Sequence, residues 1–124
     1  MAPVRFAPGE IAAWLPPGSR VLVAGVSGES LLLAEAVMAA GDALGAVTFT
    51  GALIPGVNHQ TYLANEDCRI ETFFVTPELK SEVGRRVTFL PLCYNDILGR
   101  LRGAQIDAML IMVTPPDADG NCSF

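Results

Sequence analysis

The stretch Arg20-Val-Leu-Val-Ala-Gly25, together with the helical pattern of residues 29–41 that follows it, decides the fold of this 124-residue chain. The first part is a short apolar run between the turn Pro16-Pro17-Gly18 and a glycine, which is typical of a buried strand. The second part has Glu35 as its only charged interior residue and predicts a helix that is apolar nearly all the way round and needs cover on two sides. A strand that leads into such a helix indicates an α/β domain.

The alternation of strand and helix continues toward both ends of the chain. Further strands are predicted at 45–50, 69–75, 86–90 and 106–113, and short helices at 10–15, 77–84 and 94–102. We therefore expect one α/β domain over residues 1–124, with a largely parallel, Rossmann-like sheet and helices on both faces. The run 106–113 is nearly all apolar, which predicts a central strand.

The chain ends at Phe124, inside a turn that directly follows this last strand. We interpret the domain as incomplete: the amino-terminal half of a larger fold that ends inside the domain and leaves one face of the last strand without cover.

Charge and composition exclude several classes of partner. Thirteen acidic residues against eight basic ones give a net charge of −5, and the arginines are scattered, so neither a nucleic-acid surface nor an anionic membrane is an expected partner. No apolar run approaches the roughly 18 residues that a membrane span needs. The amino end carries Pro3, Pro8 and Glu10 before any long apolar run, unlike a secretory signal, so we expect a cytoplasmic protein.

Three cysteines, Cys68, Cys93 and Cys122, lie far apart and form no metal-ligand spacing. They predict free structural thiols in a reducing compartment. Cys93 has apolar neighbours in sequence, which would raise the pKa of its thiol and make it inert.

Three loops leave the carboxyl ends of predicted strands: Gly25-Val-Ser27-Gly28, residues 51–62 and residues 114–123. In a parallel sheet these loops share one edge, which is where α/β proteins gather their ligands. Gly25, Ser27 and Gly28 lead into a helix, so they could hold an anion, or simply form a tight turn with Ser27 as the helix N-cap. The loop nearly spells the GxSxG nucleophile elbow, but Glu29 replaces the last glycine, and a serine hydrolase is disfavoured.

Asn58 and His59 lie in the longest loop, in Pro55-Gly-Val-Asn58-His59-Gln-Thr-Tyr62. Each is either a solvent-exposed loop residue or a substrate contact, and His59 has no neighbours at metal-ligand spacing. The remaining acids of this half of the chain are expected on solvated faces, since none has the apolar neighbours that raise a carboxyl pKa: Glu66, Asp67, Glu71, Glu78 and Glu82.

The last third of the chain carries a more specific pattern. It contains Gly84-Arg-Arg-Val-Thr-Phe-Leu-Pro-Leu-Cys-Tyr94-Asn-Asp, then Ile106-Asp-Ala-Met-Leu-Ile, then Thr114-Pro115-Pro116-Asp117-Ala-Asp-Gly120-Asn-Cys-Ser123. In this order the segments resemble the amino-terminal half of the acetyl-CoA hydrolase/transferase family, which includes the acetate and 4-hydroxybutyrate CoA-transferases. Thr114 stands where that family usually has serine. The opening Pro17-Gly18-Ser-Arg20-Val-Leu-Val is similar to the family more loosely.

The resemblance implies a CoA-transferase-like half whose substrates are an acyl-CoA thioester and a small carboxylic acid, with no tightly bound cofactor. In the family a glutamate attacks the thioester to form an acyl-glutamyl anhydride and then a glutamyl-CoA thioester that passes CoA to the acceptor acid. That glutamate belongs to the family's second half, so the resemblance predicts that this chain is inactive alone and forms one wall of the acyl-CoA cleft. The wall is expected to consist of Pro115, Pro116 and Asp117 together with the loop around His59. The alternative is that this motif has no binding role and only shapes a tight turn.

The partners expected from this resemblance are the missing carboxyl-terminal half or a second subunit, in a homo-oligomer. The alternative is a non-catalytic α/β module that pairs with a separate catalytic subunit through its apolar helix, residues 30–40.

Overall fold

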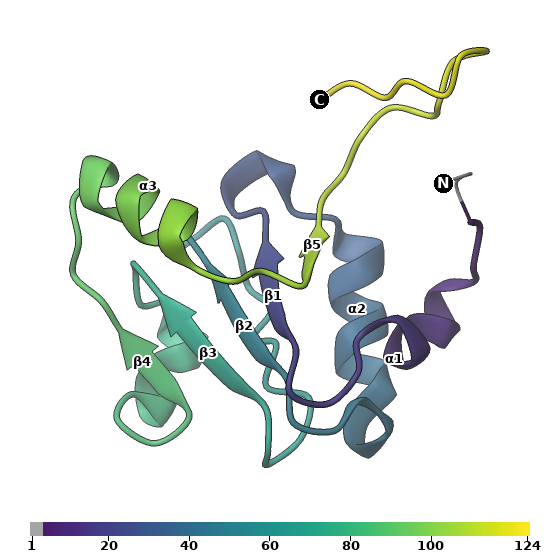
Figure 1. Cartoon of the computed structure of the whole chain (residues 1–124). Coiled ribbons are helices and arrows are strands. Elements are labelled where there is room, and N and C mark those ends of the chain that lie inside the picture. The colour runs from purple at the N-terminus through teal and green to yellow at the C-terminus, as the bar shows by residue number, and fades with distance from the viewer. Residues whose placement is uncertain (1–3) are drawn as a thin grey trace.

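The computed structural model describes residues 4–124 and contains one five-stranded sheet (Figure 1). The strands are β1 (Arg20–Val23), β2 (Thr48–Gly51), β3 (Arg69–Thr72), β4 (Val87–Phe89) and β5 (Ala108–Leu110). Their order is β4-β3-β2-β1-β5, and every neighbouring pair is parallel. The predicted parallel α/β fold is therefore confirmed.

The helices are α1 (Ile11–Trp14), α2 (Leu31–Ala40) and α3 (Tyr94–Gly103), with 3-10 turns η1 (Pro8–Glu10), η2 (Val26–Gly28), η3 (Gly41–Leu44) and η4 (Pro77–Glu82). Each falls within or beside a range that its sequence pattern predicts, apart from the short turns η2 and η3. All five observed strands are shorter than predicted. β2 and β5 begin later than their apolar runs, and β1, β3, β4 and β5 end before theirs.

One face of the sheet carries the hydrophobic core. The alternate residues of the strands that point to this face are buried, and α1, α2, η3 and η4 cover them with their own apolar side chains. The core includes Ile11, Leu15, Val21, Val23, Ala34, Val37, Leu44, Phe49, Ile70, Leu79 and Val87. This burial is the main source of stability, at roughly 25 cal/mol per Å² of apolar surface removed from water.

α3 lies over part of the opposite face, so helices lie on both faces as expected (Figure 1). Glu71 of β3 points to this second face, since its neighbours Ile70 and Thr72 are buried in the first. Its Oε2 accepts hydrogen bonds from Arg20 of β1 at 2.7 Å and from Arg100 of α3 at 3.1 Å. The Arg20 bond joins β1 to β3 within the sheet, whereas the Arg100 bond ties α3 to it. Ile97 is the one buried residue of α3, so this bond supplements a small apolar contact.

The prediction of a central strand at 106–113 is wrong. β5 pairs only with β1 and forms the edge of the sheet, and it ends at Leu110. Leu110 belongs to the core, but Met112 and Val113 are 58% and 42% exposed, so the apolar character of the last part of this run does not reflect burial among the described residues. The edge strand and the segment after it thus leave apolar surface uncovered, as the sequence led us to expect for the last strand.

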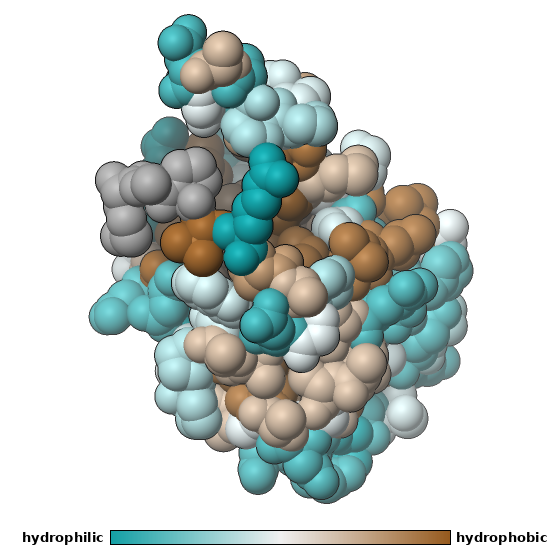
Figure 2. Space-filling model, turned by 90° about the vertical axis from the view of Figure 1, so that its right-hand side faces the viewer, coloured by the Kyte–Doolittle hydropathy of each residue, from teal (hydrophilic) through white to brown (hydrophobic). Residues whose placement is uncertain are grey.

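α2 is only partly covered on the side that faces away from the sheet. Ala34 and Val37 face the core, and α1 and η1 pack beside the helix, but Leu31 and Leu32 are each 61% exposed. Figure 2 shows apolar side chains at the surface on this side of the molecule, among polar ones. α1 and η1 therefore supply part of the predicted second cover, and the first turn of the helix stays uncovered among residues 4–124.

Within residues 4–124 no helix combines the length and the apolar character needed to cross a membrane.

Candidate functional site

The loops that follow β1 and β2 pack against each other at the carboxyl edge of the sheet. A Cβ atom added at Gly25 would lie 1.8 Å from the carbonyl oxygen of Ala52, so only glycine fits there. The first two of the three predicted loops are therefore brought together, as the parallel topology requires.

Asn58 joins the two loops and is fully buried, with none of its surface exposed. Its Oδ1 accepts hydrogen bonds from the backbone N–H groups of Val26 and Ile54, each at 2.9 Å, and its Nδ2 donates to the Val26 carbonyl at 3.1 Å. The interpretation of Asn58 as a solvent-exposed loop residue is wrong, because its amide satisfies backbone groups that would otherwise be buried without partners.

Glu29 and Tyr62 complete this network. The Tyr62 hydroxyl donates to Glu29 Oε1 at 2.7 Å, and Asn58 Nδ2 donates to Glu29 Oε2 at 2.9 Å. Glu29 is only 9% exposed and Tyr62 only 2%. Burial, and then the neighbouring Glu29 carboxylate, raise the pKa of Tyr62 well above its ordinary value of 10.0. Sequence reasoning did not find this pair, because nothing in the local pattern marks residues 33 positions apart as partners. We name Val26, Glu29, Asn58 and Tyr62 the edge cluster.

Two members of the edge cluster have a strained backbone. Val26 and Tyr62 have φ values of 56° and 58°, and they are the only non-glycine residues with positive φ in the part of the chain that the structure describes. The left-handed region is unfavourable for L-residues and especially for β-branched valine.

Ser27 and Gly28 form the turn η2 after Gly25. Ser27 is exposed and is not the N-cap of α2, since that position is taken by Ser30, whose Oγ accepts the Leu33 N–H at 3.3 Å. Glu29 precedes this cap, so it does not lie in the first helical turn where the sequence suggested it. The interpretation of Gly25 and Gly28 as residues of a tight turn agrees with the close packing at Gly25. Binding of a ligand by Gly25, Ser27 or Gly28 stays a prediction.

His59 is exposed, unlike its neighbour Asn58. Its side chain is 64% exposed, and Nδ1 lies 3.0 Å from Glu78 Oε1 at the start of η4. This contact lowers the pKa of the Glu78 carboxyl, with a contribution from its own backbone N–H. The exposure of His59 is compatible with both interpretations, so a ligand contact of its ring stays a prediction.

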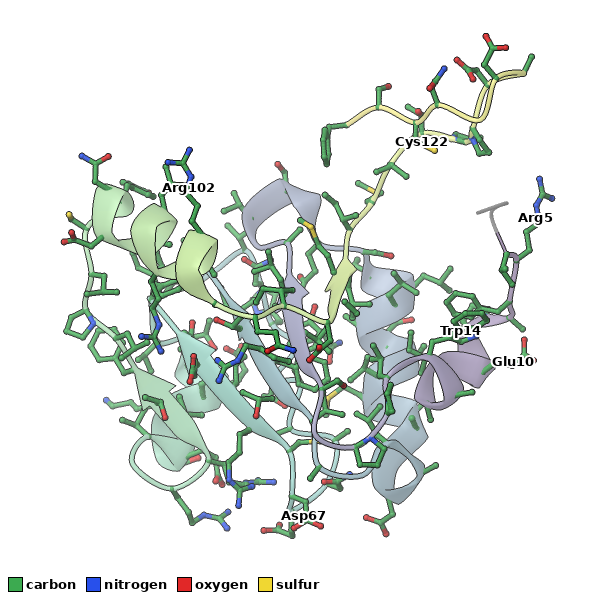
Figure 3. All side chains as sticks on the ribbon, viewed as in Figure 1. Arg5, Glu10, Trp14, Asp67, Arg102 and Cys122 are labelled. Carbon is green, nitrogen blue, oxygen red and sulfur yellow. The ribbon has the colours of Figure 1, made fainter. Side chains whose placement is uncertain are left out.

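The third loop begins at the same edge but leads away from it. The Met112 N–H donates to the Gly28 carbonyl at 3.3 Å, after which residues 114–123 form a hairpin that projects from the domain (Figures 1 and 3). Pro115, Pro116 and Asp117 are exposed and are not brought to Asn58 or Gly25.

Bonds within this hairpin explain its polar residues. The Thr114 N–H donates to the Ser123 carbonyl at 2.8 Å, and Asp117 Oδ1 accepts the Asn121 and Asp119 N–H groups at 2.8 and 2.9 Å. These backbone donors lower the pKa of Asp117. Gly120 has a φ of 85°, which favours glycine.

Two acids expected on solvated faces are in fact ion-paired and mostly covered. The Glu71 side chain is 19% exposed between Arg20 and Arg100. The Glu82 side chain is 18% exposed, and hydrogen bonds from Arg86 and then Arg85 lower its pKa to about 2. These pairs tie elements of the fold together and line no reactive site.

The cysteines are confirmed as free thiols, but only Cys68 is buried. Cys93 is exposed at the N-cap of α3, where its Sγ donates to Asp96 Oδ2 at 3.0 Å, because the chain between β4 and α3 runs outside the core. Cys122 is exposed on the hairpin (Figure 3). No group of three or more metal-ligating side chains occurs among residues 4–124.

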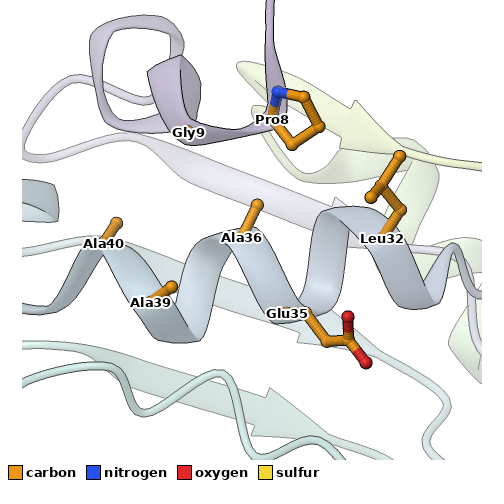
Figure 4. A pocket seen from close by; sticks show the side chains of 7 residues that line it. All are labelled: Pro8, Gly9, Leu32, Glu35, Ala36, Ala39 and Ala40. Carbon is orange, nitrogen blue, oxygen red and sulfur yellow. The ribbon is translucent and has the colours of Figure 1, made fainter.

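A separate open groove of about 300 Å³ lies between η1 and the outer side of α2 (Figure 4). Its walls are mostly small apolar residues, with Glu35 as the one acid: Pro8, Gly9, Leu32, Glu35, Ala36, Ala39 and Ala40. The groove has no nucleophilic side chain beside a general base. The edge cluster, with its hydrogen-bonded polar side chains, is therefore the better candidate for a functional site.

Comparisons with protein-family models, with curated proteins and with solved structures each gave no match to this chain.

Proposed function

We propose that the chain is the amino-terminal part of an acyl-CoA:carboxylate CoA-transferase or acyl-CoA hydrolase and forms one wall of the acyl-CoA cleft. The nucleophilic glutamate then comes from a further region or a second subunit, and this chain is inactive alone. The substrates are a coenzyme A thioester and a small carboxylic acid.

The observation that carries the proposal is the ordered series of segments ending in Thr114-Pro-Pro-Asp117-Ala-Asp-Gly120-Asn-Cys-Ser123, which resembles the acetyl-CoA hydrolase/transferase pattern. The residues that match this pattern also make the bonds of the projecting hairpin, so the resemblance falls on residues with a defined conformation. The Gly25–Gly28 loop supports the proposal from its position, because ligands of open parallel sheets bind beyond the carboxyl ends of the strands, where the strand order reverses. Here the order reverses between β1 and β5.

The test is a titration of the isotope-labelled chain with coenzyme A and with acetyl-CoA, followed by amide NMR signals. We expect shifts at residues 25–28 and 114–123, and weaker binding by Asp117→Asn. Asp119→Asn is the matched control, because no bond within the hairpin depends on the Asp119 carboxylate. Absence of any shift at millimolar coenzyme A would overturn the proposal.

One observation favours the alternative, a non-catalytic module that pairs with a catalytic subunit: Leu31 and Leu32, in the first turn of α2, are exposed. Sequencing the source DNA beyond codon 124 separates the two functions. A continuing frame with a glutamate beside a glycine-rich loop supports the CoA-transferase proposal. A stop codon with a neighbouring gene that supplies this glutamate supports the module.

A further inference from the structure

Val26 is held in a conformation that its own side chain disfavours. A left-handed backbone brings the Cβ atom of an L-residue too close to the following carbonyl oxygen, and such residues persist only where the surrounding structure enforces them. Val26 is 49% exposed, so burial of its side chain does not supply the enforcing contacts.

The enforcing contacts come from a chain of hydrogen bonds. Asn58 bonds both the N–H and the carbonyl of Val26, as a neighbouring strand would. The orientation of the Asn58 amide is fixed in turn by Glu29, which accepts from its Nδ2, and Glu29 is fixed by the Tyr62 hydroxyl. Every link is buried or half-buried and joins residues 29 to 33 positions apart.

The strain lies at the surface beside the point where the strand order reverses. Val26 and Ser27 of η2 are exposed. The Gly28 carbonyl accepts a hydrogen bond from the Met112 N–H in the segment after β5. Backbone strain that a buried network maintains at such an edge is characteristic of ligand-binding loops.

We infer that Glu29, Asn58 and Tyr62 are positioning residues that hold Val26 in the left-handed conformation and thereby set the shape of the Gly25–Gly28 loop for its ligand. The role of these residues in holding the Val26 backbone, the backbone part, follows from the geometry alone. The role of the loop shape in binding, the ligand part, rests on the proposed function, and the ligand is a coenzyme A thioester.

The backbone part is tested by NMR of the free chain. In Glu29→Gln and Tyr62→Phe we expect the HN–Hα coupling and the Cα and Cβ shifts of Val26 to move away from left-handed values. The matched controls Glu35→Gln and Tyr94→Phe change exposed residues of the same types and leave these signals unchanged. Unchanged Val26 signals in both edge-cluster variants would overturn the inference.

The ligand part is tested by coenzyme A affinity and by rescue. Tyr62→Phe is expected to weaken binding about tenfold, a change of about 1.4 kcal/mol. Adding Val26→Gly to Tyr62→Phe is expected to restore most of the affinity, because glycine adopts the left-handed region freely. The Val26 signals of Tyr62→Phe show whether the lost affinity follows the loop conformation, and chemical denaturation of both variants shows whether it follows the stability of the fold.

The two proposals fail in different ways. If the wild-type chain does not bind coenzyme A, the proposed function fails, and the Val26 signals still decide the backbone part. If the wild-type chain binds but Val26→Gly does not rescue, the proposed function stands and the positioning role is wrong.

Discussion

The two loops at the carboxyl edge of β1 and β5 are held in opposite ways. The Gly25–Gly28 loop is fixed by hydrogen bonds to residues about 30 positions away, while the Thr114–Ser123 hairpin is fixed by bonds that span at most nine. The first loop therefore depends on the folded domain, and the second keeps its shape without touching the rest of it. Substitutions in the first loop should disturb the whole domain, and those in the second only the hairpin.

The largest difference is expected between two glycines. Gly25→Ala should lower the free energy of unfolding by several kcal/mol or prevent folding, since its Cβ would overlap the backbone carbonyl of Ala52. Gly120→Ala costs about 1 kcal/mol of local strain and leaves global stability unchanged. Chemical denaturation measures both. Gly99→Ala, which adds a methyl group in open space on α3, is the control and should be neutral or slightly stabilising.

A smaller difference is expected between two asparagines. Asn58→Ala should lower the free energy of unfolding by about 3 kcal/mol or more, because it leaves the Val26 and Ile54 N–H groups buried without acceptors. Asn121→Ala in the hairpin should change it by less than about 0.5 kcal/mol. Equal effects of the two variants in urea denaturation would contradict the comparison.

Tyr62→Phe should lower the free energy of unfolding by about 1.5 kcal/mol at neutral pH, through loss of the hydroxyl bond to Glu29. Because folding raises the pKa of Tyr62, its stabilisation is complete below pH 10, the ordinary value, and is lost as the pH rises above it. Denaturation between pH 9 and 11.5 should show a steeper loss in the wild type than in Tyr62→Phe. Tyr94→Phe, on the exposed side of α3, should retain the wild-type slope.

The smallest effect concerns Asp117. Its pKa is lowered in the folded hairpin, so its stabilising contribution is present above the ordinary value of 3.8 and is lost as the pH falls through the lowered value. Amide shifts of residues 119–121 should report loss of the hairpin bonds in this acid range, and Asp117→Asn should show no such transition. Signals of the sheet residues are expected to stay unchanged until the domain itself unfolds in acid.

Much of the fold could be predicted from the sequence. The turn Pro16-Pro17-Gly18, the apolar run of β1 and the helical period of α2 are local signals, and each lies where the pattern placed it. The position of β5 could not be predicted in this way. An apolar strand at an edge and one at the centre have the same sequence pattern when the edge is left uncovered.

For the candidate site, the sequence correctly indicated that the loops after β1 and β2 meet. Parallel pairing places the carboxyl ends of neighbouring strands at the same edge of the sheet. It did not indicate that Asn58 is buried or that Glu29 and Tyr62 are partners. Side chains in loops have no periodicity, so their burial depends on which distant segment covers them.

The sequence by itself determined the strands, the helices and the turn chemistry of the Thr114–Ser123 hairpin, since these follow from interactions between residues a few positions apart. The alternation of strand with helix then indicated parallel pairing, because parallel strands are joined by crossover helices. Only the tertiary structure decided the edge position of β5, the ion pairs of Glu71 and the edge cluster around Val26. These depend on segments that approach one another after the sheet has formed, and the free energy of burying Glu29 beside Tyr62 exists only in that packed state.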